Sequence, residues 1–156
     1  HQDAPYWPLT PTKTITVWLA LDDVSAQNGA MKFIPGSHHH GQIPYQASDV
    51  GEHNVLNQTV SSPEDWGENA VNVELKAGQI SIHSDLLLHG SEPNLSTTDR
   101  RGLTLRYMPS DVQCTDSNFG KNRRAFQCLG TNPEKHWSIV SPPVGEAMPL
   151  KLETPL

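Results

Sequence analysis

Proline and glycine recur along the whole of this chain, and they restrict it to short, frequently interrupted elements. The 156 residues include 13 prolines and 11 glycines. Because both residue types favour turns and interrupt helices, this punctuation suits short strands better than helices. The segments between the turns alternate or are rich in β-branched residues, so they predict an all-β jelly roll. We expect strands over 14–21, 30–34, 71–75, 79–83, 86–89 and 102–108.

The segment 14–21 is the clearest strand, because it is rich in β-branched and aromatic residues. Successive side chains of a strand point to opposite faces. One face of this strand is therefore apolar and begins at Ile15, while the other carries Thr16 and Trp18. We expect both faces to be covered, as in a sheet packed within a sandwich or barrel.

Two segments lack a sustained period. Residues 38–69 are polar and interrupted by proline and glycine, and a long irregular stretch of this kind predicts a functional lid or a mobile insert. Residues 110–156 are expected to wrap the core as loops with one helical turn. The sequence thus predicts a single domain over 1–156, with a strand core over about 1–109 and a loop-rich tail over 110–156.

Two histidines and a carboxylate have the layout of a mononuclear iron(II) site. Alternate residues of an extended segment point to the same side, so His1 and Asp3 can bind one ion together. His89, from a distant strand, completes a 2-His-1-carboxylate set that leaves coordination positions open. A rival set joins His83 and Asp85 to His89, but one extended strand separates alternate residues by roughly 6.5–7 Å. We therefore interpret His83 as a core histidine and Asp85 as a turn carboxylate.

Arg100 and Arg101 follow His89 at the entrance to the last predicted strand. A guanidinium group at this place can form a bidentate pair with a carboxylate of a co-substrate. The arginine pair therefore adds a second element to the predicted site.

A series of short motifs follows in a consistent order along the first two-thirds of the chain. They are HQDAPYWP at 1–8, WLALDD at 18–23, NGAM at 28–31, PGSH at 35–38, HGSEPN at 89–94 and the segment 100–107. Together these motifs resemble the phytanoyl-CoA dioxygenase family of iron(II)- and 2-oxoglutarate-dependent oxygenases. The resemblance implies a double-stranded β-helix, which is a form of jelly roll, and it agrees with the strand pattern.

The resemblance also implies roles for individual residues. His1, Asp3 and His89 match the iron ligands of the family. Arg100 matches the arginine that binds the distal carboxylate of 2-oxoglutarate, with Arg101 as the alternative if the register shifts by one residue.

Three further positions match contacts with the co-substrate in the family. Trp18 matches an aromatic residue that lines the 2-oxoglutarate pocket, and Gln2 and Ser91 match residues that contact the same ligand. The implied reaction is hydroxylation of an unactivated C–H bond in a small molecule or an acyl-CoA-type substrate, with release of succinate and CO2. The family also has an N-terminal region ahead of its His-x-Asp motif, and we expect that this sequence lacks it.

Two alternatives remain open from the sequence. The first is a secreted copper monooxygenase in which the amine and imidazole of His1 form a histidine brace. The second is a jelly-roll binding module without catalytic activity.

Composition excludes some partners. The net charge of −6 and the pI near 5.7 argue against a nucleic-acid surface, which usually carries a basic stripe. The sequence has no apolar run long enough to span a membrane. We interpret Cys114 and Cys128 as free thiols in a reducing compartment, and therefore expect a cytoplasmic protein. Its expected partners are a small-molecule substrate and dioxygen.

Overall fold

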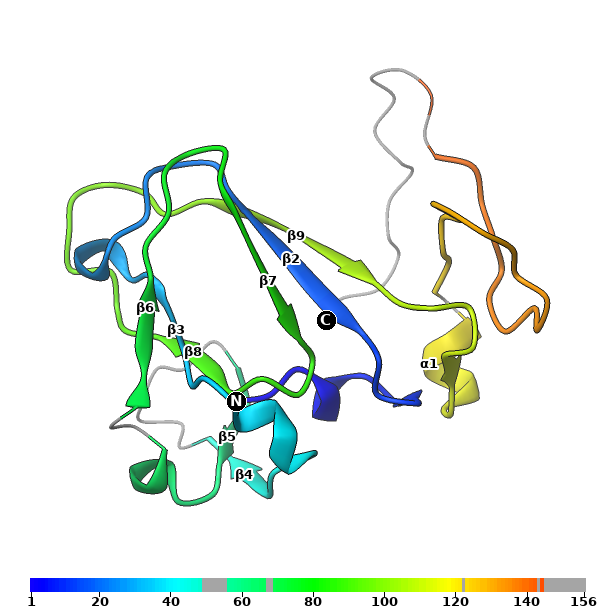
Figure 1. Ribbon diagram of the computed structural model, residues 1–156, viewed down its shortest axis with the longest axis horizontal. Coiled ribbons are helices and arrows are strands. Elements are labelled where there is room, and N and C mark those ends of the chain that lie inside the picture. The colour runs from blue at the N-terminus through cyan, green and yellow to red at the C-terminus, as the bar shows by residue number, and fades with distance from the viewer. Residues whose placement is uncertain (49–55, 67–68, 122, 143, 145–156) are drawn as a thin grey trace.

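The computed structural model describes residues 1–48, 56–66, 69–121, 123–142 and 144 (Figure 1). Most of its regular structure is β-strand. The strands are β1 (Leu9–Thr10), β2 (Ile15–Ala20), β3 (Met31–Phe33), β4 (Tyr45–Ala47), β5 (Gln58–Val60), β6 (Val71–Val73), β7 (Ile80–Ser84), β8 (His89–Ser91), β9 (Gly102–Tyr107) and β10 (Gln113–Cys114). The helices are the 3-10 turns η1 (Ala4–Tyr6), η2 (Ala26–Asn28), η3 (Ser37–His40) and η5 (Pro63–Asp65), and the α-helix α1 (Ser117–Lys121).

Two antiparallel three-stranded sheets form the centre of the fold. One has the order β7-β2-β9 and the other β6-β3-β8. Figure 1 shows them as two groups of strands, with the N-terminus close to the beginning of β8. Two smaller antiparallel pairs, β1-β10 and β4-β5, lie outside these sheets. The double-sheet, mostly β architecture confirms the predicted jelly-roll class.

The sheet β7-β2-β9 has one buried and one exposed face. Thr16 and Trp18 of β2 are buried on its inner face. The outer face is apolar yet exposed, so the expectation that both faces are covered is wrong for the described residues. Its exposed apolar residues are Ile15, Ile80, Ile82, Leu103, Leu105 and Tyr107. Ile82 is the most exposed of them, at 58%.

Two apolar clusters bring the sheets and the loops together. The first joins Trp18 and Ala20 of β2 to Met31 of β3, with Phe33 packed against it. It therefore lies between the two sheets. The second consists of Ile43, Val60 and Leu88, with Ile34 and Trp66 at its margin.

The second cluster corrects the prediction of an irregular lid over 38–69. Its described part contains η3, β4, β5 and η5, and Ile43 and Val60 are buried against Leu88. Apolar burial thus fixes this segment onto the body of the protein. Residues 49–55 and 67–68 of the segment lie outside the described residues.

The strand predicted over 86–89 is also wrong. The backbone turns after Ser84, where the N–H of Leu87 donates to the Ser84 carbonyl at 3.0 Å, and β8 begins only at His89. The turn changes the direction of the chain, so His89 begins a strand of the other sheet and does not extend β7.

The tail beyond Pro109 contains more than loops. β10 pairs with β1, and α1 supplies the expected helical turn. The indole of Trp137 donates to the carbonyl of Val112 at 2.6 Å, and Val112 is fully buried. Residues 122, 143 and 145–156 of the predicted tail lie outside the described residues. Among the described helices, none is long and apolar enough to cross a membrane.

Candidate metal centre

His1 and His89 are brought together by their backbones. The amine of His1 donates to the carbonyl of His89, and the N–H of His89 donates to the carbonyl of His1, both at 2.9 Å. Two residues that exchange both hydrogen bonds form a hydrogen-bonded antiparallel pair. The ring centroids of the two histidines are consequently only 4.1 Å apart.

Asp3 approaches from the turn that follows. It precedes η1, a 3-10 turn that carries Pro5 in its first positions, and the N–H of Ala4 donates to the carbonyl of Asp85 at 2.9 Å. His1 and Asp3 therefore do not lie in a regular strand, because the backbone already bends at Asp3, whose φ of −74° and ψ of −33° are helical. The predicted convergence is nevertheless present in the structure.

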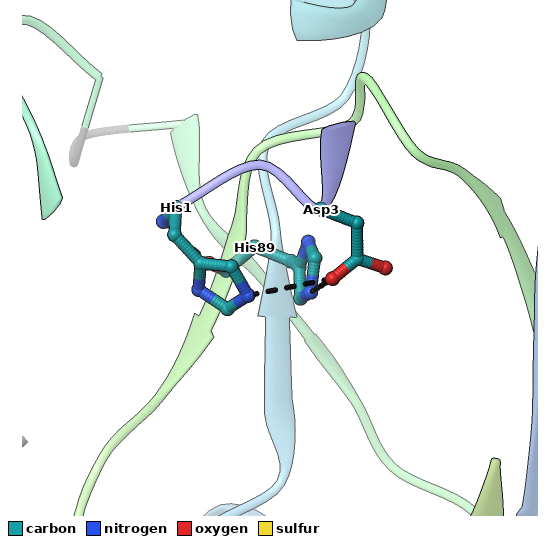
Figure 2. Close-up of side chains that lie close together, drawn as sticks. All are labelled: His1, Asp3 and His89. Carbon is teal, nitrogen blue, oxygen red and sulfur yellow. Dashed lines mark hydrogen bonds and ion pairs between the residues drawn. The ribbon is translucent and has the colours of Figure 1, made fainter. Parts of the chain in front are cut away.

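The three side chains present one ligand atom each to a common point (Figure 2). These atoms all lie within 4.8 Å of one another. Asp3 Oδ1 is 3.7 Å from His1 Nε2 and 3.8 Å from His89 Nε2. Bonds of about 2.1 Å at right angles would put neighbouring ligand atoms roughly 3 Å apart. Small side-chain rotations therefore suffice to close this set around an ion.

The neighbourhood of His89 prepares its imidazole for metal binding. Its Nδ1 lies 2.9 Å from the carbonyl of Leu87, and because a carbonyl only accepts, Nδ1 carries the hydrogen. Nε2 is then the nitrogen with the free lone pair, and it faces Asp3. Burial, with a smaller contribution from the charge of His1, lowers the pKa of His89 to about 4. The ring is therefore neutral at physiological pH, as a metal ligand must be.

The two carboxylate oxygens of Asp3 have different partners. Oδ1 faces the imidazoles, whereas Oδ2 accepts hydrogen bonds from Thr16 Oγ1 and Arg106 Nη2, both at 3.0 Å. Burial opposes ionisation of Asp3, but the interactions with His1, His89, Arg106 and Thr16 outweigh it and hold its pKa far below the ordinary value of 3.8. Asp3 is thus an anchored carboxylate with one oxygen directed at the candidate ion.

Thr16 belongs to a row of polar side chains on the inner face of the sheet β7-β2-β9. It stands opposite His83 on one side and Arg106 on the other. His83 Nε2 is 4.0 Å from Asp3 Oδ2, and the His83 ring lies 4.9 Å from that of Phe33. Thr16, Arg106 and Phe33 were not predicted as site residues. The signal for Arg106 was its place as a charged residue within the predicted strand 102–108.

Arg100 and Arg101 have separate environments. The Arg100 guanidinium lies over the Trp18 ring, 5.7 Å from its centroid, which joins the two predicted co-substrate residues. Gly102 allows this arrangement, because a Cβ at that position would overlap the Trp18 indole. Arg101 instead forms a bidentate pair with Asp22, at 2.9 and 2.8 Å. Of the two arginines, only Arg100 is therefore joined to Trp18.

Gln2 and Ser91 occupy contrasting places. Gln2 is buried, and its amide group donates to the carbonyls of Gly41 and Leu86 and accepts from the N–H of Ile43. These bonds attach the chain after η3 to the site. A contact between Gln2 and a ligand would use the second lone pair of its oxygen or replace one of these bonds. Ser91 is exposed at the end of β8.

The rival ligand set is not assembled among the described residues. His83 is buried, as expected of a core histidine, and Asp85 lies buried in the turn after β7. The group of described side chains that could hold an ion comprises His1, Asp3 and His89. Burial raises the pKa of Asp85, which fits a carboxylate held in a turn.

Comparison with known sequences identifies a single family. The family profile described as "Phytanoyl-CoA dioxygenase (PhyH)" matches residues 1–102. A phytanoyl-CoA dioxygenase of Arabidopsis thaliana is 34% identical over 112 residues, which are 71% of this chain and 38% of that protein. A probable alpha-ketoglutarate-dependent hypophosphite dioxygenase of Stutzerimonas stutzeri is 33% identical over 114 residues, 72% of this chain and 40% of that protein.

Solved structures include similar folds. A nickel complex of the non-heme monooxygenase ThoJ has a TM-score of 0.69 and 28% identity, and the match covers 93% of this chain and 49% of that one. The alpha-ketoglutarate-dependent epimerase SnoN has a TM-score of 0.58 at 22% identity, over 91% of this chain and 50% of that one. The chain spans less than half the length of the curated relatives named above.

Proposed function

Because this chain belongs to the phytanoyl-CoA dioxygenase family, we propose that it is an iron(II)- and 2-oxoglutarate-dependent oxygenase whose metal ion is held by His1, Asp3 and His89. The convergence of one ligand atom from each residue, all within 4.8 Å, is the observation that carries the proposal. Two neutral imidazoles and one carboxylate are the donor set of non-heme iron(II) oxygenases. The nickel complex of ThoJ and the named co-substrate of the hypophosphite dioxygenase give further support.

The chain supplies geometry and charge to this reaction. When bound, iron(II) and 2-oxoglutarate supply the oxidising chemistry, which consumes dioxygen, releases succinate and CO2, and converts a substrate C–H into C–OH. Thr16 and Arg106 hold Asp3 so that one oxygen faces the two imidazoles. Arg100 provides a guanidinium that can pair with the distal carboxylate of 2-oxoglutarate, and the Trp18 ring lies beneath this guanidinium.

The proposal extends to substrate and location. The substrate is a small molecule or an acyl-CoA-type compound with an unactivated C–H bond, and dioxygen is the second reactant. A reducing compartment such as the cytoplasm is supported by Cys114 and Cys128, which are free thiols among the described residues.

Replacing Asp3 by Ala tests the proposal. The variant should lose bound metal and should no longer convert 2-oxoglutarate to succinate, because the only carboxylate of the ligand set is gone. Asp111→Ala is the matched control, since Asp111 is half-exposed and pairs with Lys13. Metal content and succinate are measured on the two variants and the unchanged chain. Full succinate formation by Asp3→Ala would contradict the ligand assignment.

The other two candidate functions have less support. A histidine brace uses the amine and imidazole of His1 with a second histidine, and it gives no role to Asp3, whose Oδ1 lies beside both imidazoles. A binding module without catalytic activity would have no use for a half-buried, anchored carboxylate beside two imidazoles.

A further inference from the structure

Two polar side chains of β7 lie buried on the inner face of the sheet without hydrogen-bond partners among the described residues. Both ring nitrogens of His83 and the hydroxyl of Ser81 are in this state. The two residues are only 5% and 8% exposed. Neither belongs to the ligand set proposed above.

Their positions follow the path from the candidate metal centre to Arg100. His83 is at the metal end, with its Nε2 4.0 Å from Asp3 Oδ2 and its ring 4.8 Å from that of His89. Ser81 is one row further along the inner face, directly opposite Trp18 of β2. Since Arg100 lies over Trp18, Ser81 stands between the two ends of the site.

Leaving these groups without partners destabilises the ligand-free protein. A buried polar group that makes no hydrogen bond loses its interaction with water and gains nothing in return. In most folded proteins such groups are paired, so each exception calls for an explanation. A ligand that enters the site and accepts their hydrogen bonds would provide one.

We propose that His83 and Ser81 form a binding wall for a 2-oxo acid, in which His83 donates to oxygen atoms at its metal-chelating end and Ser81 to oxygen atoms nearer Arg100. This inference rests on the proposed function. A neutral imidazole and a hydroxyl each carry one hydrogen to donate. Asp3 Oδ2, 4.0 Å from His83 Nε2, already receives hydrogen bonds from Thr16 and Arg106. The ligand must therefore bring its own acceptor oxygens, as a carboxylate and an adjacent oxo group do.

The test uses the full chain loaded with Mn(II), and calorimetry measures the affinity for 2-oxoglutarate and for 2-oxobutyrate. His83→Phe and Ser81→Ala remove the donors, and Ile82→Ala is the control on the exposed face of the same strand. Because 2-oxobutyrate has no distal carboxylate, it reports on the metal-chelating end alone. His83→Phe should lower the affinity for both acids by about tenfold or more, since a hydrogen bond to a charged group is lost. Ser81→Ala should lower the affinity for 2-oxoglutarate by a smaller factor.

The thermal stability of the ligand-free protein should change in the direction opposite to the ligand affinity. If the groups are retained for a ligand, His83→Phe and Ser81→Ala should raise the Tm of the ligand-free protein, because each removes a buried unpaired polar group. A purely structural role predicts a lower Tm and unchanged ligand affinity. His83→Gln keeps a donor and should recover part of the affinity, which guards against a packing effect of Phe.

The outcomes separate the two proposals. Unchanged affinity for both acids in His83→Phe and Ser81→Ala, with normal binding by the unchanged chain, would overturn the inference alone. If the unchanged, Mn(II)-loaded chain binds neither acid, the proposed function fails and the inference fails with it.

Discussion

Replacing Thr16 by Val should weaken metal binding although Thr16 is not a proposed ligand. The change removes the hydroxyl that donates to Asp3 Oδ2 at 3.0 Å and keeps the volume of the side chain. Arg106 then remains as the partner of that oxygen, at 3.0 Å. A guanidinium frequently pairs with both oxygens of a carboxylate, so we expect Arg106 to draw Asp3 Oδ1 away from the two imidazoles in this variant.

The magnitude follows from the lost hydrogen bond. A hydrogen bond to a charged group contributes about 1.5–3 kcal/mol. The lower end applies here, since Arg106 still satisfies the Asp3 oxygen. We expect the free energy of unfolding of the metal-free protein to fall by about 1.5 kcal/mol. Metal affinity should fall by about tenfold, in the range seen when the hydrogen-bond partner of a ligand is removed.

Calorimetric titration with Mn(II) measures the affinity, and urea unfolding measures the stability. Thr104→Val is the matched control, because Thr104 stands one row further along the same sheet, opposite Trp18, and is exposed. It should leave both quantities unchanged. Wild-type Mn(II) affinity in Thr16→Val would refute the idea that the sheet orients Asp3 for the ion.

Three further predictions concern pH and packing. Burial lowers the pKa of His89 from the ordinary value of 6.5 to about 4. Because the unfolded state binds more protons between these pH values, the stability of the metal-free protein should fall as the pH drops from about 6.5 to about 4. Urea unfolding across this pH range measures the change, and His89→Gln should show a flatter dependence of stability on pH. The hydrogen bonds from Arg101 lower the pKa of Asp22 to about 2, so the stability that this pair contributes is present above pH 3.8 and is lost as the pH falls towards 2. Arg101→Gln should return the pKa of Asp22 towards 3.8, as measured by NMR titration. Gly102→Ala places a Cβ within the Trp18 indole, so it should reduce the unfolding free energy by about 1–3 kcal/mol in a denaturant titration; a variant as stable as the unchanged chain would contradict the close approach.

The strand pattern predicted the class of fold but not which face of the sheet would be buried. In β2, β7 and β9 the apolar residues alternate with polar ones, and apolar faces are ordinarily the buried ones. The structure has the reverse arrangement, with Ile82 and Leu105 outside and His83 and Arg106 on the inner face. An active site inside a barrel needs polar groups there, and alternation alone does not distinguish the two cases.

The convergence of His1, Asp3 and His89 was predictable because their spacing and the accompanying motifs are specific. Their supporting residues were not, since Thr16 meets Asp3 only through the register of β2 against its neighbours. The sequence likewise did not determine which residues would surround Arg100 and Arg101. Their surroundings differ because Arg101 forms an ion pair with Asp22, and these two residues are far apart in the chain.

The exposed apolar face of the sheet β7-β2-β9 has a practical consequence for laboratory work. Dyes such as ANS fluoresce on exposed apolar surface and are commonly used to detect molten globules. Here Ile82, Leu103 and Tyr107 present such a surface in the folded chain itself. A positive dye signal would therefore not indicate loss of packing in this protein, and variants should be compared by near-UV circular dichroism, which reports directly on fixed aromatic side chains.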